Sequence, residues 1–209
     1  MMQGMSSRAL RALSLVALAV VVAGCEPTSA VPAPIARPAI DPRGPREVAI
    51  VAGGCFWGME NILRQAPGVV SIEVGYAGGA SKHVTYEQVS DGDTGHAEAV
   101  RIVFDPNQIS YESLLTHWFF RGHDPTTPNR QNNDVGSQYR SAIFPVSDAQ
   151  RKTAEAVKAR VDRSGKWKRP VVTRIEPAPT WVRAEDYHQD YLIKHPDGYN
   201  DHWLRDFDF

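Results

Sequence analysis

Cysteine is scarce in this sequence, with only Cys25 and Cys55 in a chain of 209 residues. Two cysteines exclude a disulfide-rich scaffold and a zinc site made of four thiolates. An excess of one charge is also lacking. The 23 Lys and Arg residues face 24 Asp and Glu residues, and a net charge of −1 gives no long-range attraction to nucleic acid. No apolar run reaches the ~20 residues that a membrane-spanning helix needs.

The remaining composition is that of a folded, globular protein. Hydrophobic residues make up 42% of the chain, which is too many for a disordered protein. The 16 glycines and 15 prolines are too few for a fibrous one. The length suits one domain of moderate size with a substantial core.

The N-terminal residues have the pattern of a secretory signal. Arg8 and Arg11 precede an uncharged, mostly apolar run over residues 12–24. The run ends in small residues before Cys25, which resembles the lipobox of bacterial lipoproteins. That resemblance implies cleavage before Cys25, a diacylglycerol on its thiol and a fatty acid such as palmitate on its new amino group. The alternatives are an ordinary signal with an incidental cysteine, or a buried N-terminal helix.

The next segment reads as a spacer between this anchor and a folded domain. Residues 26–46 hold six of the 15 prolines and show no apolar periodicity. We therefore expect a signal peptide at 1–24, a lipid-anchored Pro-rich linker at 25–46 and one domain at 47–209. This layout predicts export to the bacterial cell envelope, held on a membrane by lipid and facing the periplasm in a Gram-negative cell.

The pattern of the domain alternates short strands with helices. Buried strands are predicted at residues 47–52, 69–76, 97–104, 139–144 and 171–176, and helices at 55–65, 110–120, 148–163 and 183–195. Two strand–helix–strand units with consecutive middle strands favour an α+β fold, a two-layer ferredoxin-like sandwich with helices packed on a mixed sheet. A doubly wound parallel sheet is the alternative.

Two residues in this pattern can carry chemistry. Cys55 follows a strand and two glycines at a predicted helix start, where free N–H groups favour a thiolate and lower its pKa. The alternative is a buried structural cysteine. Glu98 shares the parity of Val100 and Ile102, so strand alternation points its carboxyl group to the apolar face, where burial raises its pKa. A Glu98 at the solvent rim is the alternative.

Six motifs, in order and at matching spacing, resemble the peptide methionine sulfoxide reductase A family. They are GCFWG at 54–58, GYAGG at 75–79, TY at 85–86, GDTGHAEAV at 92–100, DVGSQYRS at 134–141 and AEDYHQ at 184–189. The resemblance covers roughly residues 47–195, nearly the whole domain. It implies a ferredoxin-like α+β fold, in agreement with the pattern of strands and helices.

The resemblance also implies a reaction: the reduction of methionine S-sulfoxide, free or in proteins, to methionine. Cys55 would attack the sulfoxide sulfur and become a sulfenic acid, with Glu98 supplying a proton to the oxygen. Other residues match family positions: Tyr86 and Tyr139 would bind the same oxygen, Phe56 and Trp57 would hold the S-methyl group, and Asp134 and His188 would line the site. No metal or organic cofactor is implied, and we expect a monomer.

The sequence departs from many family members in having no cysteine after Cys55 that could resolve a sulfenic acid. Cys25 is expected to be blocked by lipid. The sulfenic acid must therefore be resolved by an external thiol, from a thioredoxin-like protein or a small molecule. Two other functions stay open: a cysteine hydrolase that uses Cys55, and a non-catalytic envelope module that binds oxidised methionine.

Overall fold

The computed structural model describes residues 41–177 and 180–209. The expected signal peptide, Cys25 and the linker up to residue 40 lie outside this part of the chain, so these remain predictions. Among the described residues, no helix combines the length and apolar character that crossing a bilayer requires.

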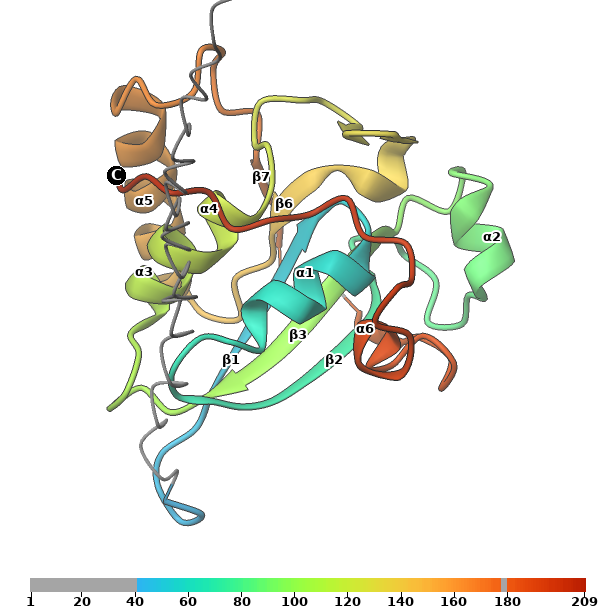
Figure 1. Ribbon diagram of the computed structural model, residues 1–209, viewed down its shortest axis with the longest axis horizontal. Coiled ribbons are helices and arrows are strands. Elements are labelled where there is room, and N and C mark those ends of the chain that lie inside the picture. The colour runs from blue at the N-terminus through green and yellow to red at the C-terminus, as the bar shows by residue number, and fades with distance from the viewer. Residues whose placement is uncertain (1–40, 178–179) are drawn as a thin grey trace, which may run out of the picture. The chain divides into compact units, whose positions relative to one another are not determined.

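The domain is built on a six-stranded mixed sheet in the order β7-β6-β1-β3-β2-β8 (Figure 1). Its strands are β1 Glu47–Gly53, β2 Val69–Ala77, β3 Ala97–Phe104, β6 Ser141–Ile143, β7 Arg174–Ile175 and β8 Val182–Arg183. Neighbouring strands are antiparallel except for β6 with β7. The four inner strands form two strand–helix–strand units, which confirms the predicted α+β, ferredoxin-like arrangement and rules out the doubly wound parallel sheet.

All described helices but the last lie between these strands in the chain, and the last follows β8. They are α1 Phe56–Leu63, α2 Tyr86–Ser90, α3 Tyr111–Leu114, α4 Phe120–Gly122, α5 Asp148–Arg163 and α6 Tyr191–Lys194. The π-helical turn η1 Leu115–Phe119 joins α3 to α4, the 3-10 turn η2 Ser137–Tyr139 precedes β6, and β4 Arg130–Gln131 pairs with β5 Asp134–Val135. The side chains of Ser110 and Ser147 cap α3 and α5.

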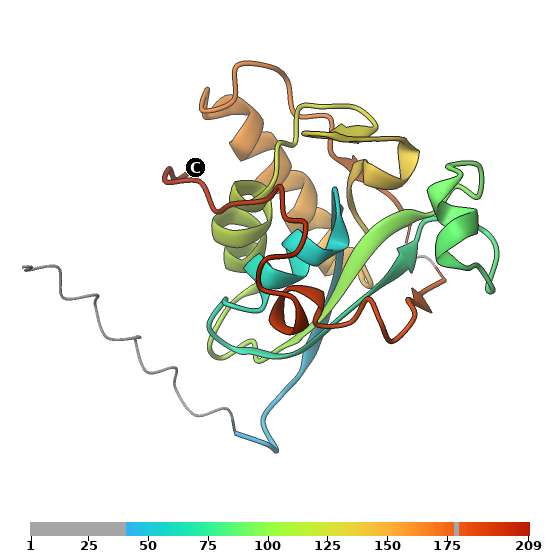
Figure 2. The same ribbon diagram turned by 45° about the vertical axis from the view of Figure 1, so that its right-hand side comes forward.

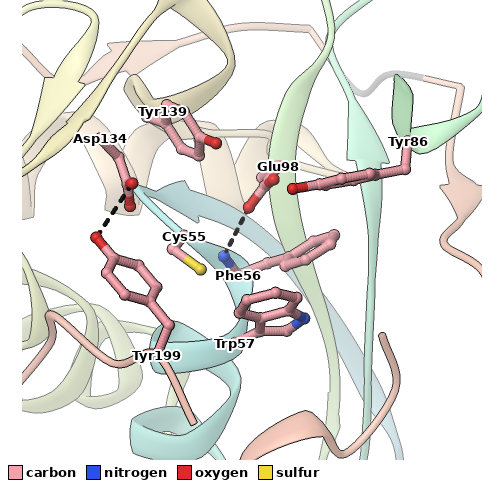
Figure 3. Close-up of a pocket in the computed structure, with 8 residues that line it drawn as sticks. All are labelled: Cys55, Phe56, Trp57, Tyr86, Glu98, Asp134, Tyr139 and Tyr199. Carbon is pink, nitrogen blue, oxygen red and sulfur yellow. Dashed lines mark hydrogen bonds between the residues drawn. The ribbon is translucent and has the colours of Figure 1, made fainter. Parts of the chain in front are cut away.

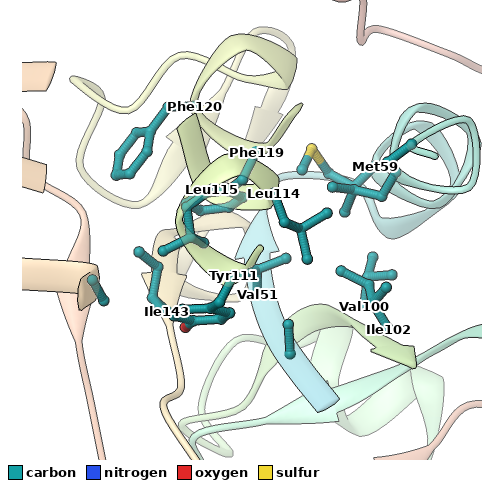
Figure 4. Packing of buried hydrophobic residues seen from close by; sticks show 14 of the residues in the cluster. Val51, Met59, Val100, Ile102, Tyr111, Leu114, Leu115, Phe119, Phe120 and Ile143 are labelled. Carbon is teal, nitrogen blue, oxygen red and sulfur yellow. The ribbon is translucent and has the colours of Figure 1, made fainter. Parts of the chain in front are cut away.

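The main core lies between the sheet and the helices on one of its faces (Figure 2). Strand residues such as Val51, Val100 and Ile102 meet Met59 of α1 there (Figure 4). The strand residues between these, whose side chains point to the opposite face of the sheet, form a second, smaller cluster that is rich in alanine. Glu98 has the parity of the main core, and this is how a carboxyl group comes to lie beneath α1.

The predicted helix at 183–195 is largely wrong, because only Tyr191–Lys194 are helical. The side chain of Gln189 instead accepts a hydrogen bond from the Val74 amide (3.0 Å) and donates to the carbonyls of Val74 (3.0 Å) and Ala184 (2.8 Å). The Ala184 amide also donates to the Val74 carbonyl. The hydrogen bonds of Gln189 and Ala184 to β2 thus replace the regular backbone bonds of a helix over residues 184–189, and β8 was not predicted at all.

Candidate active site

Cys55 lies at the junction between β1 and α1, directly before the first residue of the helix. It is 6% exposed and is the one free cysteine of the described part of the chain. Its thiol faces a small cavity of about 100 Å³, enough space for roughly three water-sized groups. Figure 3 shows the residues that line this cavity: Cys55, Phe56, Trp57, Tyr86, Glu98, Asp134, Tyr139 and Tyr199.

The turn that presents Cys55 is tightly enclosed. Gly54 has a φ of +98°, and a Cβ at this position would lie 2.5 Å from Cγ of Gln131. A Cβ on Gly53 would lie 2.9 Å from Cγ of His123. Glycine is therefore required at Gly54 both by the backbone conformation and by the space.

Glu98 reaches the same turn from β3. Its Oε2 accepts a 3.0 Å hydrogen bond from the backbone N–H of Phe56, the first residue of α1. Burial raises the pKa of Glu98 to about 8, and the nearby Asp134 and Asp201 carboxylates add to the rise, while the Phe56 N–H opposes it. At neutral pH Glu98 is therefore mostly protonated and can donate a proton, as strand parity predicted.

The pKa of the Cys55 thiol differs from the prediction. Burial and then the Glu98 carboxylate raise its pKa well above the usual value, and the Trp57 backbone N–H only partly opposes this. The predicted lowering at the helix start is thus wrong for the free protein, because loss of water around the sulfur outweighs the helix N–H groups. The thiol needs a proton acceptor at the moment of attack.

Two phenol groups complete the polar side of the cavity. Tyr86 is the first residue of α2, held there by a capping box at Thr85 and by a 3.0 Å hydrogen bond from its amide to Oε1 of Glu185. Tyr139 ends η2. Both hydroxyls point toward Glu98 (Figure 3). Burial raises the pKa of each, so both remain hydrogen-bond donors at neutral pH.

The apolar side is formed by Phe56 and Trp57. The Trp57 ring stacks on Tyr191 with a centroid distance of 3.7 Å, and its indole N–H donates a 3.2 Å hydrogen bond to Nδ1 of His188. His188 is buried and also contacts the Phe56 ring at a centroid distance of 5.0 Å. It does not line the cavity, contrary to the expectation, but lies behind these two aromatic rings and orients them.

Asp134 and Tyr199 close the remaining side. Tyr199 Oη donates a 3.1 Å hydrogen bond to Oδ1 of Asp134, and Figure 3 shows this pair across Cys55 from Tyr86. Asp134 takes the place that the sequence predicts. Tyr199 was missed, because it lies beyond the last predicted helix in a segment with no periodicity. No signal in the sequence alone identifies it.

The arrangement suits one kind of chemistry. A thiol, a protonated carboxyl group and two phenols converge on a cavity with an aromatic wall. Such a site can attack an atom that carries a polar oxygen and donate protons to that oxygen. Among residues 41–177 and 180–209 there is no group of three or more His, Cys, Asp or Glu side chains placed to hold a metal ion.

Comparisons with known proteins point to a single family. A family model described as peptide methionine sulfoxide reductase matches residues 47–207. Peptide methionine sulfoxide reductase MsrA of Nocardia farcinica is 53% identical over 157 residues, which are 75% of this chain and 89% of that protein.

Solved structures agree with the sequence comparison. Reduced Mxr1 from Saccharomyces cerevisiae superposes with a TM-score of 0.74 at 39% identity, covering 80% of this chain and 96% of that one. The same yeast protein in complex with Trx2 matches with a TM-score of 0.53 at 28% identity, covering 80% of this chain and 95% of that chain.

Proposed function

The chain belongs to the peptide methionine sulfoxide reductase family, and from that premise we propose how its own residues reduce methionine sulfoxide to methionine. It is an oxidoreductase that uses a thiol. The observation that carries the proposed mechanism is the hydrogen bond from the Phe56 N–H to Glu98, which places a protonated carboxyl group beside Cys55.

The substrate is held by the two contrasting sides of the cavity. The S-methyl group contacts Phe56 and Trp57, and the sulfoxide oxygen accepts hydrogen bonds from Tyr86, Tyr139 and Glu98. A chiral sulfoxide has its methyl group and oxygen in a fixed hand about sulfur. A site with one apolar and one polar side therefore accepts a single epimer, which we take to be the S form.

Burial is the chief cause of the raised pKa values of Cys55 and Glu98. Both groups therefore hold a proton before the reaction, and each gives up one proton during it. The Glu98 proton moves to the sulfoxide oxygen while the thiol proton moves to the Glu98 carboxylate. The S–O bond to methionine breaks, methionine leaves, and Cys55 becomes a sulfenic acid, Cys55–SOH. Cys55 is oxidised by two electrons, the sulfoxide is reduced by two, and Glu98 ends as it began.

The cycle closes with an external thiol. A thiolate attacks Cys55–SOH to form a mixed disulfide and water, and a second thiol releases reduced Cys55. Two observations support this step: no cysteine follows Cys55 in the sequence, and Mxr1 of yeast has been solved in complex with Trx2. A thioredoxin-like protein is the partner we propose, with a small-molecule thiol as the alternative.

Location in the envelope is a separate proposal, supported by the pattern of residues 1–46 alone. Lipid on Cys25 would place the domain on a membrane surface within reach of oxidised exported proteins. The test is growth with a labelled fatty acid in cells that express the chain or Cys25→Ser. Label on the wild-type chain that Cys25→Ser loses supports the anchor, and an unlabelled wild-type chain refutes it.

The reaction itself is tested with the two sulfoxide epimers. The purified chain is incubated with each epimer and excess dithiothreitol, and methionine is measured. We expect turnover of the S epimer only, and none in Cys55→Ser. A cysteine hydrolase would form no methionine, a binding module would bind without turnover, and equal activity in Cys55→Ser would refute the role of Cys55.

A further inference from the structure

The C-terminal segment after α6 crosses the start of α1 and brings two buried polar residues to the Cys55 turn. Figures 1 and 2 both show this segment, in red, beside the beginning of α1. The side chains of Asp201 and His202 are 7% and 1% exposed. Neither belongs to the motifs of the sequence analysis, and neither lines the cavity, so the mechanism above leaves them without a role.

His202 is fixed against the backbone that carries Cys55. Its Nε2 lies 2.8 Å from the carbonyl oxygen of Gly53, two residues before the nucleophile. A Cβ on Gly58 would lie 2.6 Å from His202 Nδ1, so α1 and the imidazole ring are in close contact. Because a carbonyl oxygen only accepts hydrogen bonds, Nε2 must carry a proton.

The other ring nitrogen meets Asp201. His202 Nδ1 lies 2.6 Å from Oδ1 of Asp201, although the angle falls outside the hydrogen-bond range. Neither carboxylate oxygen has a hydrogen-bond partner elsewhere in the described part of the chain. Two lone pairs repel at this distance, and the contact is relieved when one of the two atoms carries a proton. Whichever atom holds that proton, the pair as a whole carries no net charge.

The charge of this pair matters because its surroundings are acidic. Burial is the main cause of the raised pKa of Cys55 and of Glu98, and a charged Asp201 raises both further. Burial raises the pKa of Asp134, the Asp201 carboxylate adds to the rise, and His202 opposes it. In the described part of the chain, six other groups face Cys55 or the pair: Glu98 of β3, Asp134 of β5, Tyr86 of α2, Tyr139 of η2, His123 after α4 and Tyr199 after α6.

We propose that Asp201 and His202 form a proton-sharing, neutral pair that positions the Gly53–Cys55 turn and keeps an uncompensated negative charge away from the Cys55 thiol. Both are positioning residues, since they act through the turn and its charge rather than on the substrate. The proposal rests on the proposed role of Cys55 as the nucleophile.

The test is a double-mutant cycle on the rate at which iodoacetamide alkylates Cys55 at pH 7. The complete chain is used, and mass spectrometry locates the adduct on Cys55. We expect His202→Gln to slow alkylation about tenfold, because an unshared Asp201 charge raises the thiol pKa by about one unit. We expect Asp201→Asn to stay within about threefold of wild type, since the pair is neutral before and after the change.

The double variant Asp201→Asn/His202→Gln is the deciding arm. We expect it to recover most of the wild-type rate, whereas a purely structural role for His202 predicts a rate no higher than in His202→Gln. That second result would overturn the proposal. Asp206→Asn, which removes an exposed charge from the same segment, is the matched control and should leave the rate unchanged.

Two safeguards keep the test decisive. If His202→Gln does not fold, Asp201→Asn alone still decides, because a tenfold acceleration would show an uncompensated charge and contradict the neutral pair. Alkylation does not depend on sulfoxide reduction, so its outcome is separate from the Cys55→Ser result. Reductase activity retained in Cys55→Ser would refute the proposed function and leave the alkylation pattern to be judged independently.

Discussion

The backbone N–H of Phe56 and Oε2 of Glu98 are joined by a 3.0 Å hydrogen bond between the first residue of α1 and the second residue of β3. The bond links the turn that carries Cys55 to Glu98 of β3, and its two residues are 42 positions apart in the chain. A Glu98 oxygen accepts this bond in either protonation state, so the geometry can persist while the proton is given and regained.

Replacing Glu98 by Gln tests its role as the acid. We expect kcat/KM for the S epimer to fall by ~10²-fold or more, because the amide cannot give up a proton to the leaving oxygen. The wild-type kcat/KM should also decline above about pH 8, where Glu98 loses its proton in the free protein. A pH profile of both proteins checks this, and an identical decline in Glu98→Gln would mean that another group titrates.

The raised pKa of Glu98 also predicts how stability depends on pH. The carboxyl group of Glu98 ionises near pH 4.5 in the unfolded chain but near pH 8 in the folded one. Its favourable contribution to the free energy of unfolding is therefore complete below pH 4.5 and is lost as the pH rises toward 8. Between these two pH values, the free energy of unfolding of the wild type should fall by up to about 1.4 kcal/mol per pH unit relative to Glu98→Gln. Paired denaturant titrations at pH 5 and 8 measure it, and a pH-independent difference would contradict the assignment.

Tyr86→Phe and Tyr139→Phe remove one hydroxyl donor each and keep the ring. If both hydroxyls bind the sulfoxide oxygen as charge develops on it, each change should lower kcat/KM by about 10²-fold. Thermal unfolding should be nearly unchanged, which separates a lost contact to the reacting oxygen from a lost fold. Full activity in both variants would remove the tyrosines from the mechanism.

Tyr199→Phe tests the residue that the sequence did not reveal. The change breaks the 3.1 Å hydrogen bond to Asp134, and a lost hydrogen bond of about 1 kcal/mol corresponds to a KM about fivefold higher. We expect kcat to stay near the wild-type value, because Tyr199 orients Asp134 at the cavity wall. Tyr187→Phe, at an exposed tyrosine, is the control, and equal KM values in all three proteins would exclude this role.

Much of the fold was predictable because it depends on local patterns. The strands β1, β2 and β3 follow from short apolar runs in the sequence, and α5 has the predicted bounds of residues 148–163. Residues 184–189 were misread, because the side chain of Gln189 bonds to β2 and replaces the backbone hydrogen bonds of a helix. A long-range interaction of this kind leaves no periodic signal.

The site likewise combines features that local patterns predict with features that depend on long-range packing. Strand parity placed Glu98 correctly, and the motifs named the residues around Cys55. The pKa of Cys55 was misjudged, because burial depends on how α1, β3 and the C-terminal segment pack together. Tyr199, Asp201 and His202 reach the site only because that segment folds back over α1, and this requires the three-dimensional structure.

The central claim is that Cys55 alone takes up the oxygen and that an external thiol must remove it. The most direct measurement is a single-turnover reaction with excess S-sulfoxide and no reductant, followed by mass spectrometry of the intact and digested chain. The account predicts one methionine per chain and a sulfenic acid on Cys55, trapped by a sulfenic-acid reagent. A Cys25–Cys55 disulfide, or methionine formed with Cys55 unmodified, would contradict it.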